Sequence, residues 1–197
     1  MSTRDQFIAT AEHLFAARGF YGVSIAAIAE QMGLTKQALL HYFSSKEKLY
    51  GEVLQAISGE LLAVTREIIE READPASRLT ELVVAHLHKL LQNPDAARLI
   101  MRELLDNEQR AGSAASWYLQ PYLETLVDTA LMLDPARVED RGQALAMIYQ
   151  LLGAAHYFAI SGPTLSRMFG PDTYAEAAAR CEQELRQLIR ARLAGER

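Results

Sequence analysis

The sequence predicts an all-α protein of about nine helices, arranged as a small N-terminal three-helix domain followed by a larger helical domain. Apolar residues recur every three or four positions through most of the chain, which is the period of a helix with one buried face. Residues that cap or break helices bound each of these segments, mainly Ser, Thr, Gly and Asp-Pro or Asn-Pro pairs. No segment shows the strict alternation of apolar and polar residues that is typical of a half-buried strand.

The composition is that of a globular protein. Half of the 197 residues are hydrophobic and 23% are charged. Polar residues interrupt the apolar runs before the roughly 18 positions that a membrane span requires, and Met1–Gln6 lacks the layout of a signal peptide. Cys181 is the one cysteine and cannot form an internal disulfide. We therefore expect a cytoplasmic protein with no membrane partner.

The net charge of −5 is unevenly distributed. Residues 1–50 carry five basic and four acidic side chains, a net charge of +1, whereas residues 51–197 carry fifteen basic and twenty-one acidic ones, a net charge of −6. This asymmetry is too small to support or to exclude nucleic-acid binding. Only the placement of individual side chains can indicate whether the protein binds nucleic acid.

The first predicted helix runs from Thr3 to about Arg18 and ends at Gly19. Ser2 or Thr3 can cap its start. Its apolar residues form one stripe, which predicts packing against the helices that follow. The stripe comprises Phe7, Ile8, Ala11, Leu14 and Phe15.

Two short helices joined by a tight turn come next, the first over Ser24–Met32 and the second over Lys36–Tyr42. Their N-cap residues are Ser24 and Thr35, whose hydroxyls can accept an amide hydrogen bond from the first turn. Gly33 ends the first helix because glycine reaches positive φ without a steric penalty. The inward-facing residues are expected to be Ile25, Ile28, Ala29, Met32, Ala38 and Leu39, with Leu34 buried between the helices.

Two helices joined by a short glycine-containing turn form a helix-turn-helix, which places its second helix in the DNA major groove. The side chains left to project suit that task, since Lys pairs with phosphate and Gln can pair bidentately with adenine. The candidates for base edges or flanking phosphates are Thr35, Lys36, Gln37 and His41. The candidates for the DNA backbone are Ser24, Tyr42 and Lys46.

Two cations of this region have alternative roles. Lys46 lies at the start of a long helix, where an anionic partner is favoured, so it either contacts phosphate or is a solvated lysine. Arg4 either reaches the duplex backbone or belongs to a helix that serves only for packing.

Six further helices are predicted from apolar spacing and breakers. Ser45 can cap the first of them, which leads from the N-terminal domain into the rest of the chain. Ser161–Pro171, with two Gly-Pro steps, is expected to be a loop. The expected helices are Lys46–Glu72, Ser77–Gln92, Asp95–Asn107, Ser113 or Ser116 to Leu133, Arg137–Ile160 and Thr173–Leu193.

The last two helices carry the features of a dimer interface. Small residues in Arg137–Ile160 allow a second helix to approach closely, and Thr173–Leu193 has an apolar seam of period near 3.5. The seam packs on a neighbouring helix or on a second copy of itself. It comprises Tyr174, Ala178, Cys181, Leu185, Leu188 and Ile189.

The sequence contains no catalytic template, no phosphate-binding glycine loop and no Cys/His set at metal spacing, so no enzyme, metal or cofactor is predicted. His86 and His88 project about 200° apart on a helix and cannot bind one ion together. Several polar or aromatic residues of the body are either core or ion-pair residues, or contacts to a small-molecule effector. They are His86, Arg102, Glu103, Trp117, Tyr118, Tyr122 and His156.

The segment from Gln6 to Leu54 resembles the DNA-binding domain of TetR/AcrR-family repressors. Val23 stands where that family usually has Thr, and Leu40 where it usually has an aromatic residue. The residues that carry the resemblance are Ile8, Ala11, Leu14, Phe15, Gly19, Phe20, Ser24, Ile28, Ala29, Gly33, Leu34, Thr35, Leu39, Tyr42, Phe43, Lys46, Glu47 and Leu49.

The resemblance implies a homodimeric repressor that binds a palindromic operator in double-stranded DNA and is released by an unknown small-molecule effector. Residues 1–47 would form the helix-turn-helix domain, and residues 48–197 the effector-binding and dimerisation domain. One alternative is a structural or architectural DNA-binding dimer without an effector. Another is an enzyme with a vestigial helix-turn-helix, against which the missing catalytic residues argue.

Overall fold

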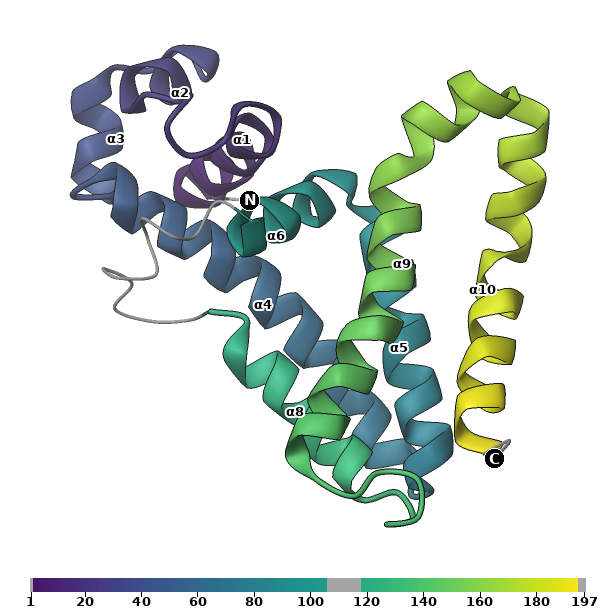
Figure 1. Ribbon diagram of the computed structural model, residues 1–197. Coiled ribbons are helices and arrows are strands. Elements are labelled where there is room, and N and C mark those ends of the chain that lie inside the picture. Colours follow the sequence, from purple (N-terminus) through teal and green to yellow (C-terminus); the bar gives the residue numbers. More distant parts are fainter. Residues whose placement is uncertain (1, 106–117, 195–197) are drawn as a thin grey trace. The chain divides into compact units, whose positions relative to one another are not determined.

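The computed structural model describes residues 2–105 and 118–194, and these ranges contain nine α-helices and no strand (Figure 1). The predicted all-α fold is confirmed. The helices are α1 (Thr3–Arg18), α2 (Ile25–Gln31), α3 (Lys36–Tyr42), α4 (Lys46–Arg71), α5 (Pro75–Gln92), α6 (Pro94–Leu105), α8 (Gln120–Leu131), α9 (Arg141–Phe169) and α10 (Pro171–Ala194).

Short polar side chains begin six of the described helices, α1 to α5 and α9, by accepting a backbone amide hydrogen bond. The caps predicted at Ser2, Ser24, Thr35 and Ser45 are all present, and each contributes on the order of 1 kcal/mol to helix stability. The amide donors are Asp5 (3.2 Å), Ala27 (3.1 Å), Ala38 (3.2 Å) and Lys48 (3.2 Å), and Asp74 accepts from the Ser77 amide (2.8 Å).

The chain forms two compact units. The first comprises Met1–Glu60 and Asp95–Leu119, and the second comprises Leu61–Pro94 and Gln120–Arg197. Helix α4 contributes to both, with residues 46–60 in the first unit and 61–71 in the second. The first unit therefore contains more than the three helices of the predicted DNA-binding domain, because it includes part of α4 and most of α6.

Aromatic and aliphatic side chains fill the core of the first unit. Phe15 packs edge-on against Tyr50 with ring centroids 5.1 Å apart, and Phe7 packs edge-on against Phe43 at 6.3 Å. Full burial of such a side chain stabilises the fold by roughly 1.5–3 kcal/mol. The largest fully buried side chains here are Phe7, Phe15, Ile28, Leu39, Phe43, Leu49, Leu54 and Leu99.

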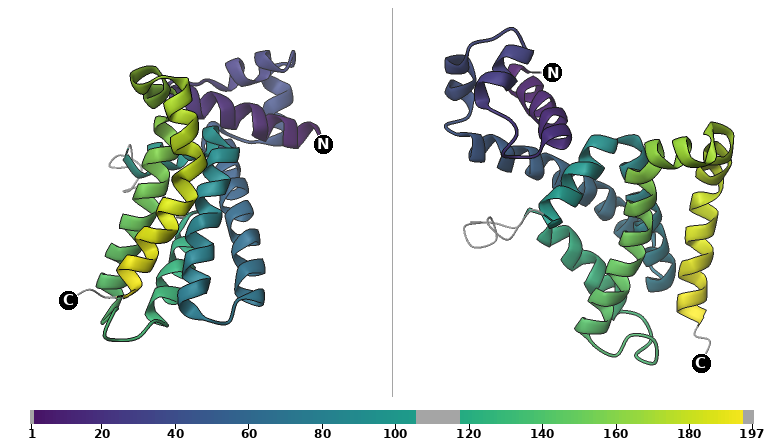
Figure 2. Two further views of the ribbon diagram at one scale, coloured as in Figure 1. Left: turned by 90° about the vertical axis from the view of Figure 1, so that its right-hand side faces the viewer. Right: turned by 45° about the horizontal axis from the view of Figure 1, so that its top comes forward.

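The second unit is a bundle in which α9 packs against α5, α8 and α10, and α5 also contacts α8 and α10 (Figures 1 and 2). Helices α9 and α10 run in opposite directions and are joined by one residue, Gly170, with φ +89° (Figure 1). The buried α9 residues are mostly aliphatic or small, which supports close packing. They are Ala144, Met147, Ile148, Leu151, Leu152, Ala155, His156, Ala159 and Gly162.

The prediction of a loop over Ser161–Pro171 is wrong, because α9 continues to Phe169 with Pro163 inside it. Proline in a helix interior costs about 3 kcal/mol, yet tertiary packing outweighs that cost here. Phe158 stacks on Tyr174 of α10 with ring centroids 6.0 Å apart, and a Cβ at Gly162 would meet the Tyr174 hydroxyl at 2.5 Å. Figure 1 shows α9 bending near its C-terminal end, as expected at an internal proline.

The predicted start of one helix differs from the structure, and the predicted start of another, at Ser113 or Ser116, lies outside the described residues. Helix α9 begins at Arg141 rather than Arg137, because Asp140 caps it by accepting the Gln143 amide (2.8 Å). The described part of the predicted helix ending at Leu133 is α8, whose first turn contains Pro121. Pro is well placed in a first turn, since its missing N–H has no intrahelical partner there.

Among the described residues, α9 has the length and composition of a membrane span, with a mean hydropathy of 1.3 over an 18-residue window. In that window 44% of the residues are buried inside the protein. A core helix of a globular protein has the same properties, so this observation alone is weak support for a membrane helix.

Candidate nucleic-acid interface and buried polar cluster

The α2–turn–α3 corner has the geometry that its sequence predicts. Ile28 and Ala29 of α2 and Leu39 of α3 are buried and hold the two helices together. Gly33 adopts φ +68°, and the Leu34 amide donates to the Ala29 carbonyl at 2.9 Å, which closes the end of α2. The prediction that Leu34 is buried is wrong, because its side chain is 39% exposed where the turn points it outward.

Helix α3 exposes the side chains proposed to meet DNA. Leu39 is its one buried residue, whereas Lys36, Gln37, His41 and Tyr42 are exposed. The Tyr42 ring lies 5.6 Å from the Phe7 ring, and this contact orients the phenol while leaving 45% of the residue exposed. The helix therefore presents a lysine, an amide, an imidazole and a phenol on its outer surface, which is the chemistry of phosphate and base-edge contacts.

Thr35 and Ser24 are exposed, but both hydroxyl oxygens already accept a capping hydrogen bond. Each hydroxyl retains its own hydrogen and can donate it outward. A phosphate oxygen is an acceptor, so capping and a DNA contact are compatible at both positions.

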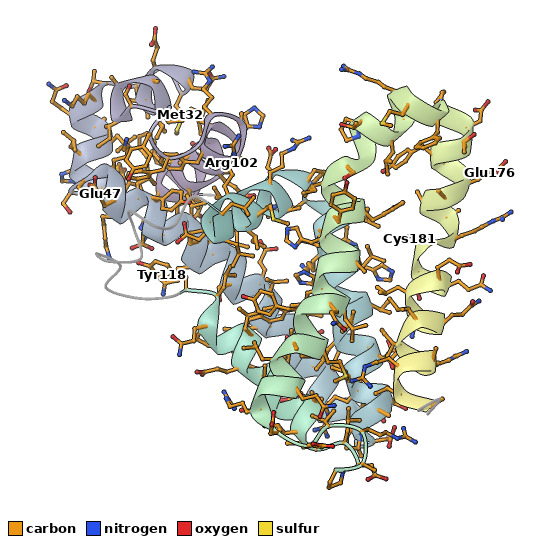
Figure 3. All side chains as sticks on the ribbon, in the orientation of Figure 1. Met32, Glu47, Arg102, Tyr118, Glu176 and Cys181 are labelled. Carbon is orange, nitrogen blue, oxygen red and sulfur yellow. The ribbon has the colours of Figure 1, made fainter. Side chains whose placement is uncertain are left out.

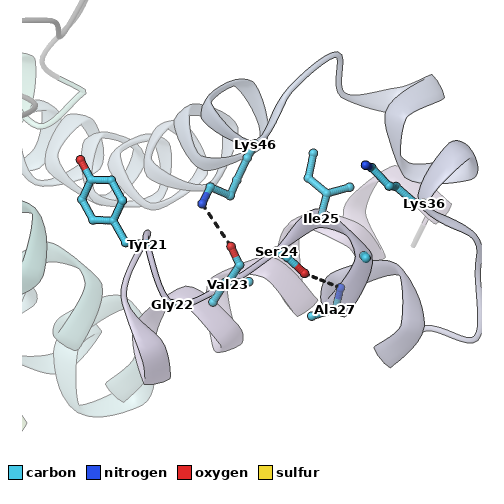
Figure 4. Close-up of a pocket in the computed structure, with 9 residues that line it drawn as sticks. Tyr21, Gly22, Val23, Ser24, Ile25, Ala27, Lys36 and Lys46 are labelled. Carbon is cyan, nitrogen blue, oxygen red and sulfur yellow. Dashed lines mark hydrogen bonds between the residues drawn. The ribbon is translucent and has the colours of Figure 1, made fainter.

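Lys46 has a structural role that its position in the sequence did not indicate. Its ammonium donates to the carbonyls of Phe20 (3.1 Å) and Val23 (3.2 Å) and lies 4.2 Å from the centre of the Phe20 ring. These contacts tie the start of α4 to the segment between α1 and α2, and Figure 4 shows the bond to Val23. An ammonium has three donors, so one remains for an anion.

A surface hollow lies beside this contact, at the start of α2 (Figure 4). Lys36 and Lys46 both line it, and Ser24 adds its hydroxyl. Two ammonium groups at one hollow favour an anionic ligand. The full lining is Tyr21, Gly22, Val23, Ser24, Ile25, Ala26, Ala27, Lys36 and Lys46.

Arg4 is engaged within the protein. Its guanidinium pairs with Glu52 of α4 at 2.8 Å and lies 5.3 Å from the centre of the Phe43 ring.

The two departures from the family pattern have local explanations. Val23 is buried, so it contributes its carbonyl rather than a hydroxyl, and Leu40 is half-buried on the side of α3.

Three of the predicted effector residues meet in the second unit. The Tyr122 hydroxyl lies 3.0 Å from Nδ1 of His86, and the His156 ring centroid lies 5.6 Å from that of His86. The two histidines are 4% exposed and Tyr122 is 3% exposed. Burial lowers the pKa of His86 to about 3, with the neighbouring His156 as a second cause, and burial raises the pKa of Tyr122.

The remaining predicted effector residues that the structure describes belong to the first unit, and Figure 3 labels two of them, Arg102 and Tyr118. Arg102 and Glu103 belong to the first unit, where the Arg102 Nε donates to the Ala16 carbonyl (3.1 Å) and Glu103 accepts from the Tyr50 hydroxyl (2.9 Å). Tyr118 is in the same unit, and its carbonyl accepts from the Ser58 hydroxyl (2.6 Å). Trp117 lies outside the described residues.

His86 and His88 point apart, as predicted from their spacing. His88 is on the surface, where its Nε2 lies 2.7 Å from a Glu182 carboxylate oxygen. No group of three or more potential metal ligands is found within the described ranges. The Glu182 carboxylate also accepts from Arg186, which in turn pairs with Glu81 of α5 (2.6 Å), so this ion-pair cluster connects α10 to α5.

Sequence reasoning missed the contacts that depend on tertiary structure. Nothing in the spacing of Lys46 indicates its two carbonyl acceptors, which lie more than 20 positions earlier in the chain. The same holds for the Arg186–Glu81 pair. The helix-turn-helix, with its exposed second helix, was found because its signals are local.

Together, the all-α fold and this exposed helix define the class of helix-turn-helix DNA-binding proteins.

The comparisons with known proteins specify the family. Residues 7–53 match the model of bacterial regulatory proteins of the tetR family. The repressor KstR2 from Mycobacterium tuberculosis is 30% identical over 106 residues, which cover 50% of this chain and 53% of KstR2. The chain thus spans about half the length of the curated relatives it matches.

Two solved structures share the fold over nearly the whole chain. A TetR-family regulator from Bordetella parapertussis has a TM-score of 0.71 at 22% identity, covering 98% of this chain and 94% of that one. FadR from Bacillus subtilis, solved with stearoyl-CoA, has a TM-score of 0.70 at 19% identity, covering 98% and 99%. Residues 7–53 therefore match the DNA-binding domain of tetR-family bacterial regulatory proteins, and the chain as a whole shares the fold of the two solved structures.

Proposed function

We propose that this protein is a cytoplasmic, homodimeric transcriptional repressor that binds a palindromic operator and is released by a small molecule. The observation that carries the proposal is the exposure of α3. Leu39 is the one buried residue of this helix, and its other face is open to solvent. One such helix reads a few base pairs, so two related by a two-fold axis are needed for an operator. The half-sites would lie about 34–36 Å apart, or a multiple of that distance.

The DNA contacts divide by chemistry. Gln37 reads a base edge, since its amide matches adenine, with Thr35, Lys36 and His41 beside it. Ser24, Tyr42 and Lys46 hold the phosphate backbone and fix the register. The hollow between Lys36 and Lys46 supports this assignment, because a phosphate there would face two ammonium groups.

The dimer would form through α9 and α10, meeting the same pair of the partner as a four-helix bundle. The support is apolar surface on both helices that no described residue covers: Tyr157 is 72% exposed and Leu188 is 48% exposed. Exposed large apolar groups on neighbouring helices mark an association surface. Leu145, Tyr149, Met168 and Phe169 add to it.

Effector control would reside in residues 48–197, while residues 1–47 read the DNA. Support for a ligand comes from the FadR structure, which was solved with stearoyl-CoA. The buried His86–Tyr122–His156 cluster is the place that we assign to effector recognition, with Arg102, Glu103 and Tyr118 serving the packing of the first unit. Helix α4, shared by the two units, would transmit the change.

Selection from a pool of random duplexes tests the proposal without knowledge of the operator. We expect enrichment of a palindrome by the full-length protein and a twofold symmetric footprint on it. A variant with both Lys36 and Gln37 replaced by Ala should enrich nothing, while Lys89→Ala on α5 should behave as the unmodified protein. Absence of any enriched sequence would refute the regulator assignment.

A further inference from the structure

One polar atom in the core of the second unit has no hydrogen-bond partner. Nε2 of His86 is fully enclosed, although Nδ1 of the same ring is paired with the Tyr122 hydroxyl at 3.0 Å. It is the one such side-chain atom among the described residues. Buried polar groups are almost always paired, so an enclosed ring nitrogen without a protein partner points to a partner that is not part of the protein.

Counting hydrogen-bond partners assigns the protons of this pair. If Tyr122 donates to Nδ1, its O–H is satisfied and only the N–H at Nε2 is left without a partner. The opposite arrangement leaves two groups without a partner, the Tyr122 O–H and the Nε2 lone pair. The first arrangement is therefore favoured, and it makes Nε2 a hydrogen-bond donor.

The charge of the surroundings limits what can accept this hydrogen bond. The buried polar residues of the described part of this unit are Thr65, His86, Thr129 and His156, and none is an acid, a lysine or an arginine. Both threonine hydroxyls donate to carbonyls of their own helices, Thr65 to Leu61 and Thr129 to Thr125. His86 itself is neutral at physiological pH, since burial and His156 both disfavour its charged form. A buried carboxylate or phosphate would lack a countercharge, which is costly.

The remaining neighbours are apolar or small. Leu82 and Val83 are buried one turn before His86 on α5, and Leu126 is buried one turn after Tyr122 on α8. On α9, the buried residues one turn before and after His156 are Leu152 and Ala159, which are apolar. An apolar environment with one free donor binds an apolar molecule and orients it by a single polar atom.

We propose that His86, Tyr122 and His156 form a binding site for an uncharged, largely apolar small molecule whose carbonyl, ester or ether oxygen accepts a hydrogen bond from Nε2 of His86. The site deepens the proposed function and rests on it only in calling the bound molecule an effector. An acidic ligand would be rejected by the absence of a countercharge, which gives the site selectivity for neutral oxygen compounds.

The test uses three matched pairs of probes on the full-length protein without DNA. The neutral members are 2-octanone, cyclohexanone and methyl benzoate, and the charged members are octanoate, cyclohexanecarboxylate and benzoate. The readout is the nitrogen resonance of Nε2 in protein labelled with ¹⁵N-histidine, which reports on this atom in the unmodified chain. We expect a saturable shift of the His86 signal with at least one neutral probe, and none with its charged counterpart.

Two variants complete the design. His86→Leu should weaken binding of the neutral probe at least fivefold, whereas His88→Ala, two residues along the same helix but on the surface, should leave it unchanged. Tyr122→Phe removes the hydroxyl that donates to Nδ1 and should let the His86 tautomer change, seen as exchange of the Nδ1 and Nε2 shifts. The His86 resonances of the unmodified protein give a result even where a variant fails to fold.

The proposal is overturned if no neutral probe shifts the His86 signal, if a carboxylate binds as tightly as its neutral partner, or if His86→Leu binds unchanged. Because no DNA is present, these results are independent of the operator selection described above. Failure here would leave DNA recognition standing, and failure there would leave this site standing.

Discussion

The guanidinium of Arg102 caps the C-terminus of α1: its Nε donates to the Ala16 carbonyl at 3.1 Å and its Nη2 to the Ala17 carbonyl at 3.4 Å. The last carbonyls of a helix lack intrahelical donors, and a cation there also interacts favourably with the helix dipole. Together with the His13–Asp95 contact at 2.7 Å, this bond fixes α6 on α1 within the first unit. Among the described residues, the contacts of Arg102 are therefore to the end of a helix.

Arg102→Ala should lower the free energy of unfolding of the first unit by about 1–2 kcal/mol, because two carbonyls lose a charged donor that is partly exposed to solvent. Denaturant titration followed by far-ultraviolet circular dichroism measures the change. Arg98→Ala is the control on the same helix, since Arg98 makes an exposed pair with Asp95 and should cost under about 0.5 kcal/mol. Equal effects of the two variants would contradict the capping role.

Lys46→Ala should reduce both stability and DNA affinity. Stability falls by about 1–3 kcal/mol because two carbonyls of the α1–α2 segment lose their donor. Affinity falls for all sequences alike, and the slope of log K against log[salt] becomes shallower by about one unit, if the third donor meets a phosphate. Lys48→Ala, with a lysine that is 62% exposed, is the matched control. An unchanged salt slope would leave Lys46 with the structural role alone.

Gln37→Ala should relax sequence preference at one operator position, with a loss of about 1–3 kcal/mol of discrimination between the preferred base pair and the others. Binding titrations on the selected duplex and on duplexes altered at single positions measure this. Lys36→Ala provides the contrast, since loss of a phosphate contact weakens every duplex equally. The division of roles fails if the two variants have the same profile across the duplexes.

The stability of the second unit should fall as the pH is lowered from about 6.5 towards 3. The pKa of His86 is about 3 in the folded protein and about 6.5 when unfolded, so in this window the unfolded chain binds more protons. The loss approaches about 1.4 kcal/mol per pH unit and is absent above pH 7. Melting temperatures between pH 5 and 7, where most carboxylates stay ionised, should depend less on pH in His86→Leu than in the unmodified protein. Equal slopes would contradict the burial of a neutral imidazole.

Tyr157→Glu should convert the proposed dimer to monomer, because it places a charge in apolar surface that would be buried between two copies. Sedimentation velocity at several protein concentrations measures the association state. Leu131→Glu, on α8, introduces the same charge at a residue that is 38% exposed and should leave the dimer intact. A monomer in the unmodified protein would itself remove the basis for operator binding by two half-sites.

Local chemistry explains which features could be predicted. Ser2, Ser24, Thr35 and Ser45 each accept an amide three residues ahead, so the start of a helix depends on a stretch of four residues. The turn at Gly33 is equally local, as is the outward direction of Gln37, which follows from the burial of Leu39 two positions later. These signals were sufficient for the all-α fold, the helix-turn-helix and the resemblance of the N-terminal domain to tetR-family regulators.

The features that could not be predicted depend on contacts between segments that are distant in the sequence. Pro163 signals a helix break, yet Tyr174 and Phe158 hold α9 against α10 and the helix continues past it. Lys46 donates to a carbonyl 23 positions away in the chain, and Arg102 donates to one 86 positions away. No local sequence pattern reveals such partners. His86, Tyr122 and His156 were each a candidate on its own helix, but only packing could bring one hydroxyl to one ring nitrogen and leave the other nitrogen enclosed. Periodicity records which face of a helix is apolar, whereas the identity of the side chain facing it depends on how the helices pack.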